Sequence, residues 1–250
     1  MASQVPGVEA RPAEATAAFL LIHGFCAAPD EVRTLADYLS ARGIASFSVQ
    51  IAGHNTTPED LRDTTWQDWY NSVVRGLHVV RSWDYERIFV AGFSLGGALA
   101  VMLAPREDDI EGLVLIAPAL NLFGVLPRLV PILKHFMEFR DIDVEKAQEV
   151  YEVKRTKYDR EPVSAYHELL KLQKMARESL GAITVPAVII QGKEDKTISP
   201  KNGQIAYDGI ASETKVLHII DEAEHVIPCH HTRHEAYQLI GEFLEKQFGI

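Results

Sequence analysis

Residues 87–97 read Arg-Ile-Phe-Val-Ala-Gly-Phe-Ser-Leu-Gly-Gly, and they set the architecture of the chain. The apolar run Arg87–Ala91 predicts a short buried strand, and the small and apolar residues from about Leu95 to Leu103 predict a helix. Between them, Gly92-x-Ser94-x-Gly96 has the spacing with which a strand turns sharply into a helix and leaves a serine hydroxyl exposed at the sheet edge. We therefore predict a reactive serine at position 94. The alternative is a helix-start serine beside packing glycines.

Strands and helices alternate on both sides of this turn. Helices that follow most strands carry apolar residues at helical spacing, and this alternation favours a parallel sheet covered on both faces. The sequence thus predicts an α/β fold with a mostly parallel sheet of six or seven strands. Besides 87–91, the predicted strands are 17–22, 44–49, 112–116, 187–191 and 215–220.

The pattern changes between residues 120 and 181, where we expect helical segments only. We interpret 120–181 as a small helical cap inserted into a core formed by residues 1–119 and 182–250. Apolar residues are dense at the start of this segment, and they predict walls of a pocket, core packing or an amphipathic membrane-surface stretch. The pocket candidates are Leu122, Phe123, Val125, Leu126, Leu129, Phe136 and Met137.

The first predicted strand ends at His23-Gly24-Phe25, where a backbone N–H can hold an oxyanion that develops beside Ser94. We predict Phe25 N–H and Leu95 N–H as the two donors, because donors fixed in place before charge develops stabilise a transition state strongly. We expect His23 to brace this loop. A second base is the alternative.

A nucleophilic serine of this kind needs an acid and then a histidine, each at the end of a later strand. Asp195 follows 187–191 and is our predicted acid, with the adjacent Glu194 as its rival. His225 follows 215–220 and is the predicted general base. In this arrangement the histidine takes the serine proton and the carboxylate fixes its tautomer. A solvated loop histidine is the alternative.

Composition excludes several classes of protein. The chain has 250 residues, 47% of them hydrophobic, and a net charge of −10 without a Lys/Arg-rich run, so we expect no nucleic-acid partner. Cys26 and Cys229 are too few for a disulfide framework, although one pair remains possible. Residues 1–15 contain no secretory signal and no run reaches 18 apolar residues, so we predict a cytoplasmic protein without stable membrane insertion. The oligomeric state stays open.

Several motifs together resemble the bacterial carboxylesterase and monoacylglycerol lipase branch of the α/β-hydrolase family, from Phe19 to the C-terminus. They are Leu20-Leu21-Ile22-His23-Gly24-Phe25, Gly53-His54, Thr57-Pro58-Glu59-Asp60-Leu61, Thr65-Trp66-Gln67-Asp68-Trp69, Gly92-Phe93-Ser94-Leu95-Gly96-Gly97, Asp195 and His225. The chain departs from this pattern at Cys26-Ala27, where the family often has Thr-Gly.

The resemblance implies a serine esterase that acts on short to medium-chain acyl esters or monoacylglycerols, without a cofactor or a metal. It also implies that Ser94, Asp195 and His225 form a catalytic triad, with Phe25 and Leu95 as oxyanion donors and the cap forming the acyl pocket. Two alternatives remain. The same triad also suits an amidase or a carbon–carbon hydrolase, and the fold alone suits a binding module without turnover.

Overall fold

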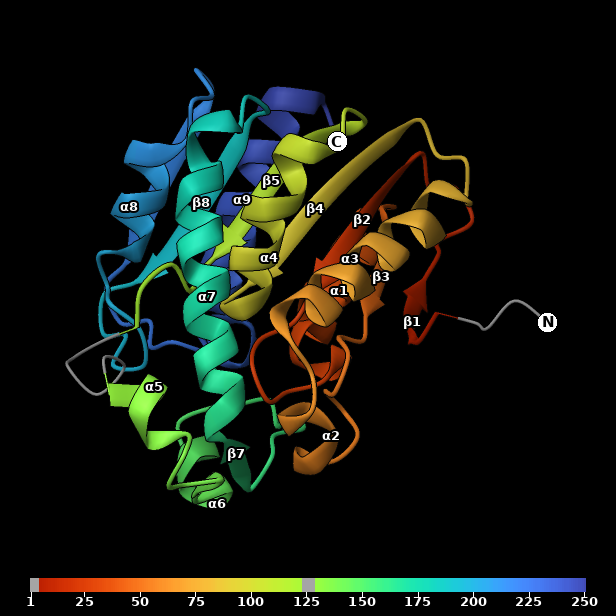
Figure 1. Cartoon of the computed structure of the whole chain (residues 1–250). Coiled ribbons are helices and arrows are strands. Elements are labelled where there is room, and N and C mark those ends of the chain that lie inside the picture. Colours follow the sequence, from red (N-terminus) through yellow and green to blue (C-terminus); the bar gives the residue numbers. More distant parts are fainter. Residues whose placement is uncertain (1–4, 123–128) are drawn as a thin grey trace.

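The computed structural model describes residues 5–122 and 129–250, and its centre is a seven-stranded sheet (Figure 1). The strands lie in the order β1-β3-β2-β4-β5-β8-β9, and every neighbouring pair is parallel except β1 with β3. The sheet confirms the predicted architecture. The strands of this sheet are β1 (Gly7–Ala10), β2 (Ala17–Ile22), β3 (Ala45–Val49), β4 (Arg87–Phe93), β5 (Ile110–Ile116), β8 (Ala187–Gly192) and β9 (Lys215–Ile220).

The central strands are buried on both faces because their side chains alternate between two apolar cores. In β2, Leu20 and Ile22 belong to one core, whereas Phe19 and Leu21 belong to the other. Continuous apolar runs of this kind are typical of parallel strands covered by helices on both sides.

The helices divide between these two cores. α3, α4, α7 and α8 contribute buried residues to the first core, and α1 and α9 contribute to the second. Figure 1 shows α3, α4 and α7 side by side over the front of the sheet. The helices are α1 (Arg33–Ala41), α2 (Pro58–Arg62), α3 (Trp66–Arg81), α4 (Leu95–Leu103), α5 (Val130–Leu133), α6 (Val144–Gln148), α7 (Val163–Ser179), α8 (Asn202–Gly209) and α9 (Arg233–Phe248), with single 3-10 turns at Pro29–Val32, Ala104–Arg106, Leu180–Ala182 and Ile227–Cys229.

Six of the seven strands match the predicted segments, and β1 is the strand that was not located in advance. Its four residues, Gly-Val-Glu-Ala, are mostly exposed and carry no apolar run. β1 instead gains its place through antiparallel pairing with β3, where Gly7 lies opposite Val49. An edge strand that is held by backbone pairing leaves little trace in the sequence.

The segment 120–181 contains strands as well as helices, which corrects the prediction of helices only. β6 (Phe139–Asp141) and β7 (Arg160–Pro162) form a separate antiparallel pair. Three-residue strands are too short to show an alternating pattern. Figure 1 shows α5, α6 and β7 below the sheet, with α7 leading back along α4.

The helix α7 joins this segment to the main core. Leu169, Leu172 and Ala176 are buried in the same core as Leu99 and Leu103 of α4. Its C-terminal part therefore covers the sheet. Among the helices described, none is both long enough and apolar enough to cross a bilayer.

Candidate functional site

Ser94 lies in the sharp turn between β4 and α4 with strained backbone angles. Its φ is 52° and its ψ is −113°, a combination that non-glycine residues rarely adopt. Its amide N–H donates to the carbonyl of Ile116 at 3.0 Å, which ties the turn to the end of β5. The neighbouring glycines allow close backbone approach, since a Cβ on Gly92 would lie 2.2 Å from the carbonyl oxygen of Gly96.

We predict that Gly96→Ala destabilises the fold and lowers activity together. An added Cβ would lie 2.1 Å from the carbonyl oxygen of Ile22. Because this contact is with backbone at the end of β2, α4 must move away from β2. We expect a loss of at least about 1–3 kcal/mol in the free energy of unfolding, and a misplacement of Ser94 by about 1 Å is enough to lower kcat roughly 100-fold.

Denaturant unfolding and ester kinetics check this prediction, with Gly181→Ala as the matched control. A Cβ added at Gly181 would meet no atom within 4 Å among the described residues beyond its immediate chain neighbours. A Gly96→Ala variant as stable and active as the control would contradict the steric argument.

Ser94, His225 and Asp195 form one chain of hydrogen bonds, although they come from the ends of three different strands. His225 Nε2 lies 2.9 Å from Ser94 Oγ, and His225 Nδ1 lies 2.7 Å from Asp195 Oδ2. All three side chains are buried. The structure therefore brings together the three residues that the sequence predicted as a triad.

Asp195 receives four hydrogen bonds, and its rival Glu194 is exposed. The backbone N–H groups of Thr197 and Ile198 donate to Oδ1 at 2.9 and 3.0 Å, and Gln191 and His225 reach Oδ2. Burial alone raises the pKa of the Asp195 carboxyl, but the hydrogen bonds from His225 and the two backbone N–H groups outweigh it and hold the pKa below its usual value. The carboxylate that touches His225 thus stays ionised in the neutral range.

The loop after β2 lies beside Ser94, and His23 braces it as predicted. His23 Nδ1 donates to the carbonyl of Gly24 at 2.8 Å, and Nε2 accepts the N–H of Ile51 at 3.3 Å. Both ring nitrogens are thus engaged away from Ser94, so the ring has no role as a second base. In the part of the chain described, no protein group accepts the N–H of Phe25 or of Leu95.

We predict that stability falls as the pH drops below the ordinary histidine value of about 6.5. Burial lowers the pKa of His23, and it lowers the pKa of His54 well below the usual value, with the neighbouring His23 adding to it. A group with a lowered pKa binds fewer protons when folded, so its stabilisation is complete above about pH 6.5 and is lost as the pH falls toward the lower folded-state pKa.

Thermal unfolding at pH 7.5, 6 and 5 measures this dependence. His54→Phe, which keeps the aromatic contacts with Phe25 and Trp69, should flatten it. The exposed His231→Asn should leave it unchanged. Equal pH dependence in all three proteins would contradict the assignment.

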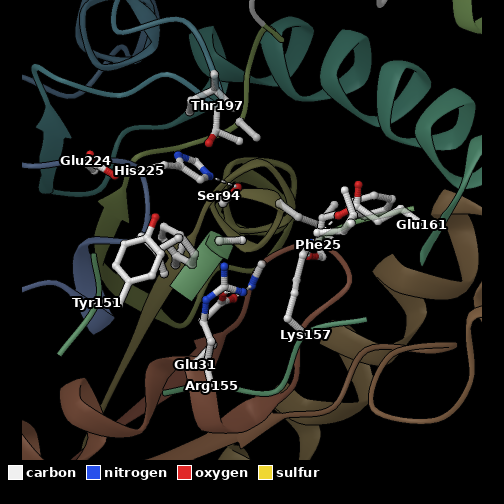
Figure 2. A pocket seen from close by; sticks show the side chains of 18 of the residues that line it. Phe25, Glu31, Ser94, Tyr151, Arg155, Lys157, Glu161, Thr197, Glu224 and His225 are labelled. Carbon is white, nitrogen blue, oxygen red and sulfur yellow. Dashed lines mark hydrogen bonds and ion pairs between the residues drawn. The ribbon is translucent and has the colours of Figure 1, made fainter. Parts of the chain in front are cut away.

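Ser94 and His225 open into a cavity of about 410 Å³. This volume is within the usual range for small-molecule sites. Segment 120–181 supplies half of the residues that line it, and Figure 2 shows several of these side chains around Ser94. The apolar lining includes Phe25, Phe93, Leu122, Ile142, Ala147, Val150, Leu169 and Ile198.

Of the four predicted pocket residues that the structure describes, only Leu122 lines this cavity. Leu129, Phe136 and Met137 are 49%, 85% and 46% exposed and are not among its lining residues, so they are not walls of it. Apolar density does not reveal which way a side chain points. Phe123, Val125 and Leu126 lie outside the described residues.

The cavity also has a charged side that sequence reasoning missed. Arg155 pairs with Glu31 at 2.7 Å, and Lys157 pairs with Glu161, which also accepts the hydroxyl of Tyr166. Figure 2 shows Arg155 and Lys157 entering the cavity from the same side. In the sequence these charges resemble a solvated surface, whereas in the structure the side chains of Arg155, Glu31 and Glu161 are less than 10% exposed.

Cys26 and Cys229 are both buried and free. Among residues 5–122 and 129–250, no group of three or more His, Cys, Asp or Glu side chains is arranged to hold a metal ion.

The sequence is also similar to those of known hydrolases. The sequence model of the family described as serine aminopeptidase, S33, matches residues 13–230. The chain is 28% identical over 229 residues to a carboxylesterase of Bacillus subtilis (strain 168), which covers 92% of each chain. It is 29% identical over 232 residues to a thermostable monoacylglycerol lipase of Bacillus sp. (strain H-257), covering 92% of this chain and 91% of the relative.

Solved structures agree with these sequence relatives. A structure from work on LipS and LipT, two metagenome-derived lipolytic enzymes, matches with a TM-score of 0.87 at 26% identity, covering 96% of this chain and 97% of the other. A soluble variant of monoglyceride lipase from Saccharomyces cerevisiae has a TM-score of 0.80 at 18% identity, covering 96% and 91%. The α/β-hydrolase fold and the resemblance to the esterase and monoacylglycerol lipase branch are thus confirmed.

Proposed function

Because the chain belongs to the hydrolase family described as serine aminopeptidase, S33, we propose that it is a serine hydrolase that cleaves carboxylic esters through an acyl-enzyme on Ser94. Its relatives include a carboxylesterase and a monoacylglycerol lipase. The observation that carries the proposal is the hydrogen-bonded chain Ser94–His225–Asp195, of which Ser94 and His225 line the 410 Å³ cavity.

In the first step, Ser94 Oγ attacks the ester carbonyl carbon while His225 Nε2 takes the serine proton. The carbonyl electrons move to its oxygen, which accepts hydrogen bonds from the N–H groups of Phe25 and Leu95. The tetrahedral intermediate collapses, His225 returns the proton to the alcohol, and the acyl group remains on Ser94.

In the second step, water attacks the acyl-enzyme with His225 as base and releases the carboxylic acid. Asp195 accepts Nδ1–H of His225 throughout, which keeps Nε2 free to take a proton and stabilises the imidazolium.

The lining of the cavity supports an ester with two unlike parts. Leu122, Leu169 and Ile198 belong to the apolar side, which suits a short to medium acyl chain. The polar side of the lining, which includes Arg140, Lys146 and Thr197, suits a polar alcohol, such as the diol of a monoacylglycerol. Segment 120–181 acts as the cap that encloses both.

Initial rates on p-nitrophenyl esters from acetate to laurate test this function. We expect one preferred acyl length below laurate, and faster turnover of the ester than of the p-nitroanilide with the same acyl chain. Faster cleavage of the anilide would favour an amidase instead. A chain without turnover of either would be a binding module.

A further inference from the structure

Four successive residues of the cap hold the loop that carries Phe25. We call Arg155–Tyr158 the strap, and each of its residues contacts a residue of the loop 25–31. The contacts are Arg155 Nη1 with Glu31 Oε1 at 2.7 Å, Thr156 N and Oγ1 with Asp30 Oδ2 at 2.9 and 2.8 Å, Lys157 Nζ with the carbonyl of Phe25 at 3.2 Å, and Tyr158 N with the carbonyl of Cys26 at 3.1 Å.

Glu31 links this strap to the backbone of Gly24. Its Oε2 accepts the N–H of Gly24 at 2.7 Å, while Oε1 faces Arg155. The Glu31 side chain is 2% exposed and that of Arg155 is 8% exposed. A charge so deeply buried is stable only with a counterion and hydrogen bonds, and Arg155 and Gly24 provide them.

The two peptide groups of Gly24 are therefore both fixed. Glu31 holds its N–H, and His23 Nδ1 holds its carbonyl. In a planar trans peptide the carbonyl and the following N–H point in opposite directions. Because the Gly24 carbonyl is turned toward His23, the N–H of Phe25 is turned the other way and stays unpaired among the described groups.

We infer that Glu31 is a positioning residue of the oxyanion hole, held in place by Arg155 of the strap. This inference rests on the proposed function. When the bond from the Gly24 N–H to the Glu31 carboxylate is weakened or lost, the His23–Gly24 peptide is freer to rotate. His23 Nδ1 alone then holds the Gly24 carbonyl, and with it the direction of the Phe25 N–H. The cap then contributes to transition-state stabilisation as well as to substrate binding.

The test compares turnover with binding of a trifluoromethyl ketone that carries the preferred acyl chain. Ser94 Oγ adds to the ketone carbon, its proton passes to His225, and the ketone oxygen becomes an oxyanion with no leaving group. We expect Glu31→Gln and Arg155→Met to lower kcat about 10- to 100-fold, with KM changed less than about threefold. The inhibition constant of the ketone should rise by the factor by which kcat/KM falls.

Arg155→Lys, which keeps the cation, should recover most of the activity. Glu152→Gln is the matched control. Glu152 lies in segment 120–181, as Arg155 does, and its carboxylate pairs with Arg233 of α9 at 2.6 Å, but it is not among the residues that line the cavity. Its kcat and ketone affinity should equal those of the wild type. If a single variant does not fold, the double variant Glu31→Gln/Arg155→Met leaves no unpaired buried charge. It should still lose at least about tenfold in kcat, because a neutral hydrogen bond to Gly24 is weaker.

Three results would overturn the inference: unchanged kcat, a fall in kcat without weaker ketone binding, or a rise in KM alone. The last would make Arg155 a substrate-binding residue. Wild type and Ser94→Ala are measured first. Absence of both ester turnover and ketone inhibition in the wild type would overturn the proposed function and this inference with it, whereas normal behaviour of the Glu31 and Arg155 variants overturns the inference alone.

Discussion

Ser94→Ala is expected to reduce kcat on the preferred ester by about 10⁴- to 10⁶-fold. Without Oγ no acyl-enzyme forms, and water must attack the ester directly. The substitution removes one small hydroxyl whose hydrogen bond is made to His225. We therefore expect the variant to fold, with KM or the affinity for a product carboxylate close to that of the wild type.

Steady-state rates and the burst of p-nitrophenol at high enzyme concentration measure this effect. The burst reports acylation, so it should be present in the wild type when deacylation is the slower step and absent in the variant. Ser82→Ala is the matched control, because Ser82 is exposed at the end of α3 and its hydroxyl donates to the carbonyl of Val79. Turnover that survives in Ser94→Ala would remove Ser94 as the nucleophile.

Asp195→Asn is expected to lower kcat by about 10³- to 10⁴-fold through the tautomer of His225. Two backbone N–H groups donate to Oδ1 of Asp195, so an asparagine must place its carbonyl oxygen there. Its NH₂ group then faces His225 Nδ1 in the position of Oδ2. The ring responds by carrying its proton on Nε2, where it faces Ser94 and can no longer accept the serine proton.

Glu194→Gln is the control for this substitution. It changes the neighbouring carboxylate in the same way, but the side chain of Glu194 is exposed, and its backbone N–H donates to the carbonyl of Ala223. We expect rates within about twofold of the wild type, as for most exposed substitutions. A larger loss in Glu194→Gln than in Asp195→Asn would assign the acid to position 194.

The parts of the fold that could be predicted are those in which local pattern and final environment agree. β2 is predicted to the residue because all six of its side chains are buried. The start of α3 also has a local cause, because the side chains of Thr65 and Asp68 form a reciprocal cap there, and both residues lie within four positions of each other in the sequence. The turn at Ser94 is recognisable because the backbone packs so closely there that Gly92 and Gly96 leave no space for a Cβ atom.

What could not be predicted depends on contacts between distant segments. Arg155 and Glu31 are 124 positions apart in the sequence, and nothing near either residue indicates that both are buried. For Leu129 and Phe136 the error is the opposite one, because they were predicted as buried pocket walls and are exposed. Their apolar character can be read from the sequence, but their exposure depends on the direction in which the cap points their side chains. Charge and hydropathy along the chain carry no such information.

The order of the strands has a consequence for when the enzyme becomes active during folding. Ser94 and His225 are 131 positions apart, and β5 and β8 lie between the strands from which they extend. Parallel strands at such separations pair slowly, because each pairing closes a long loop. Hydrolytic activity should therefore return late during refolding, after most of the helical signal. A nascent chain released only up to β8 has its serine but no base, so it is inert until the last strand has docked.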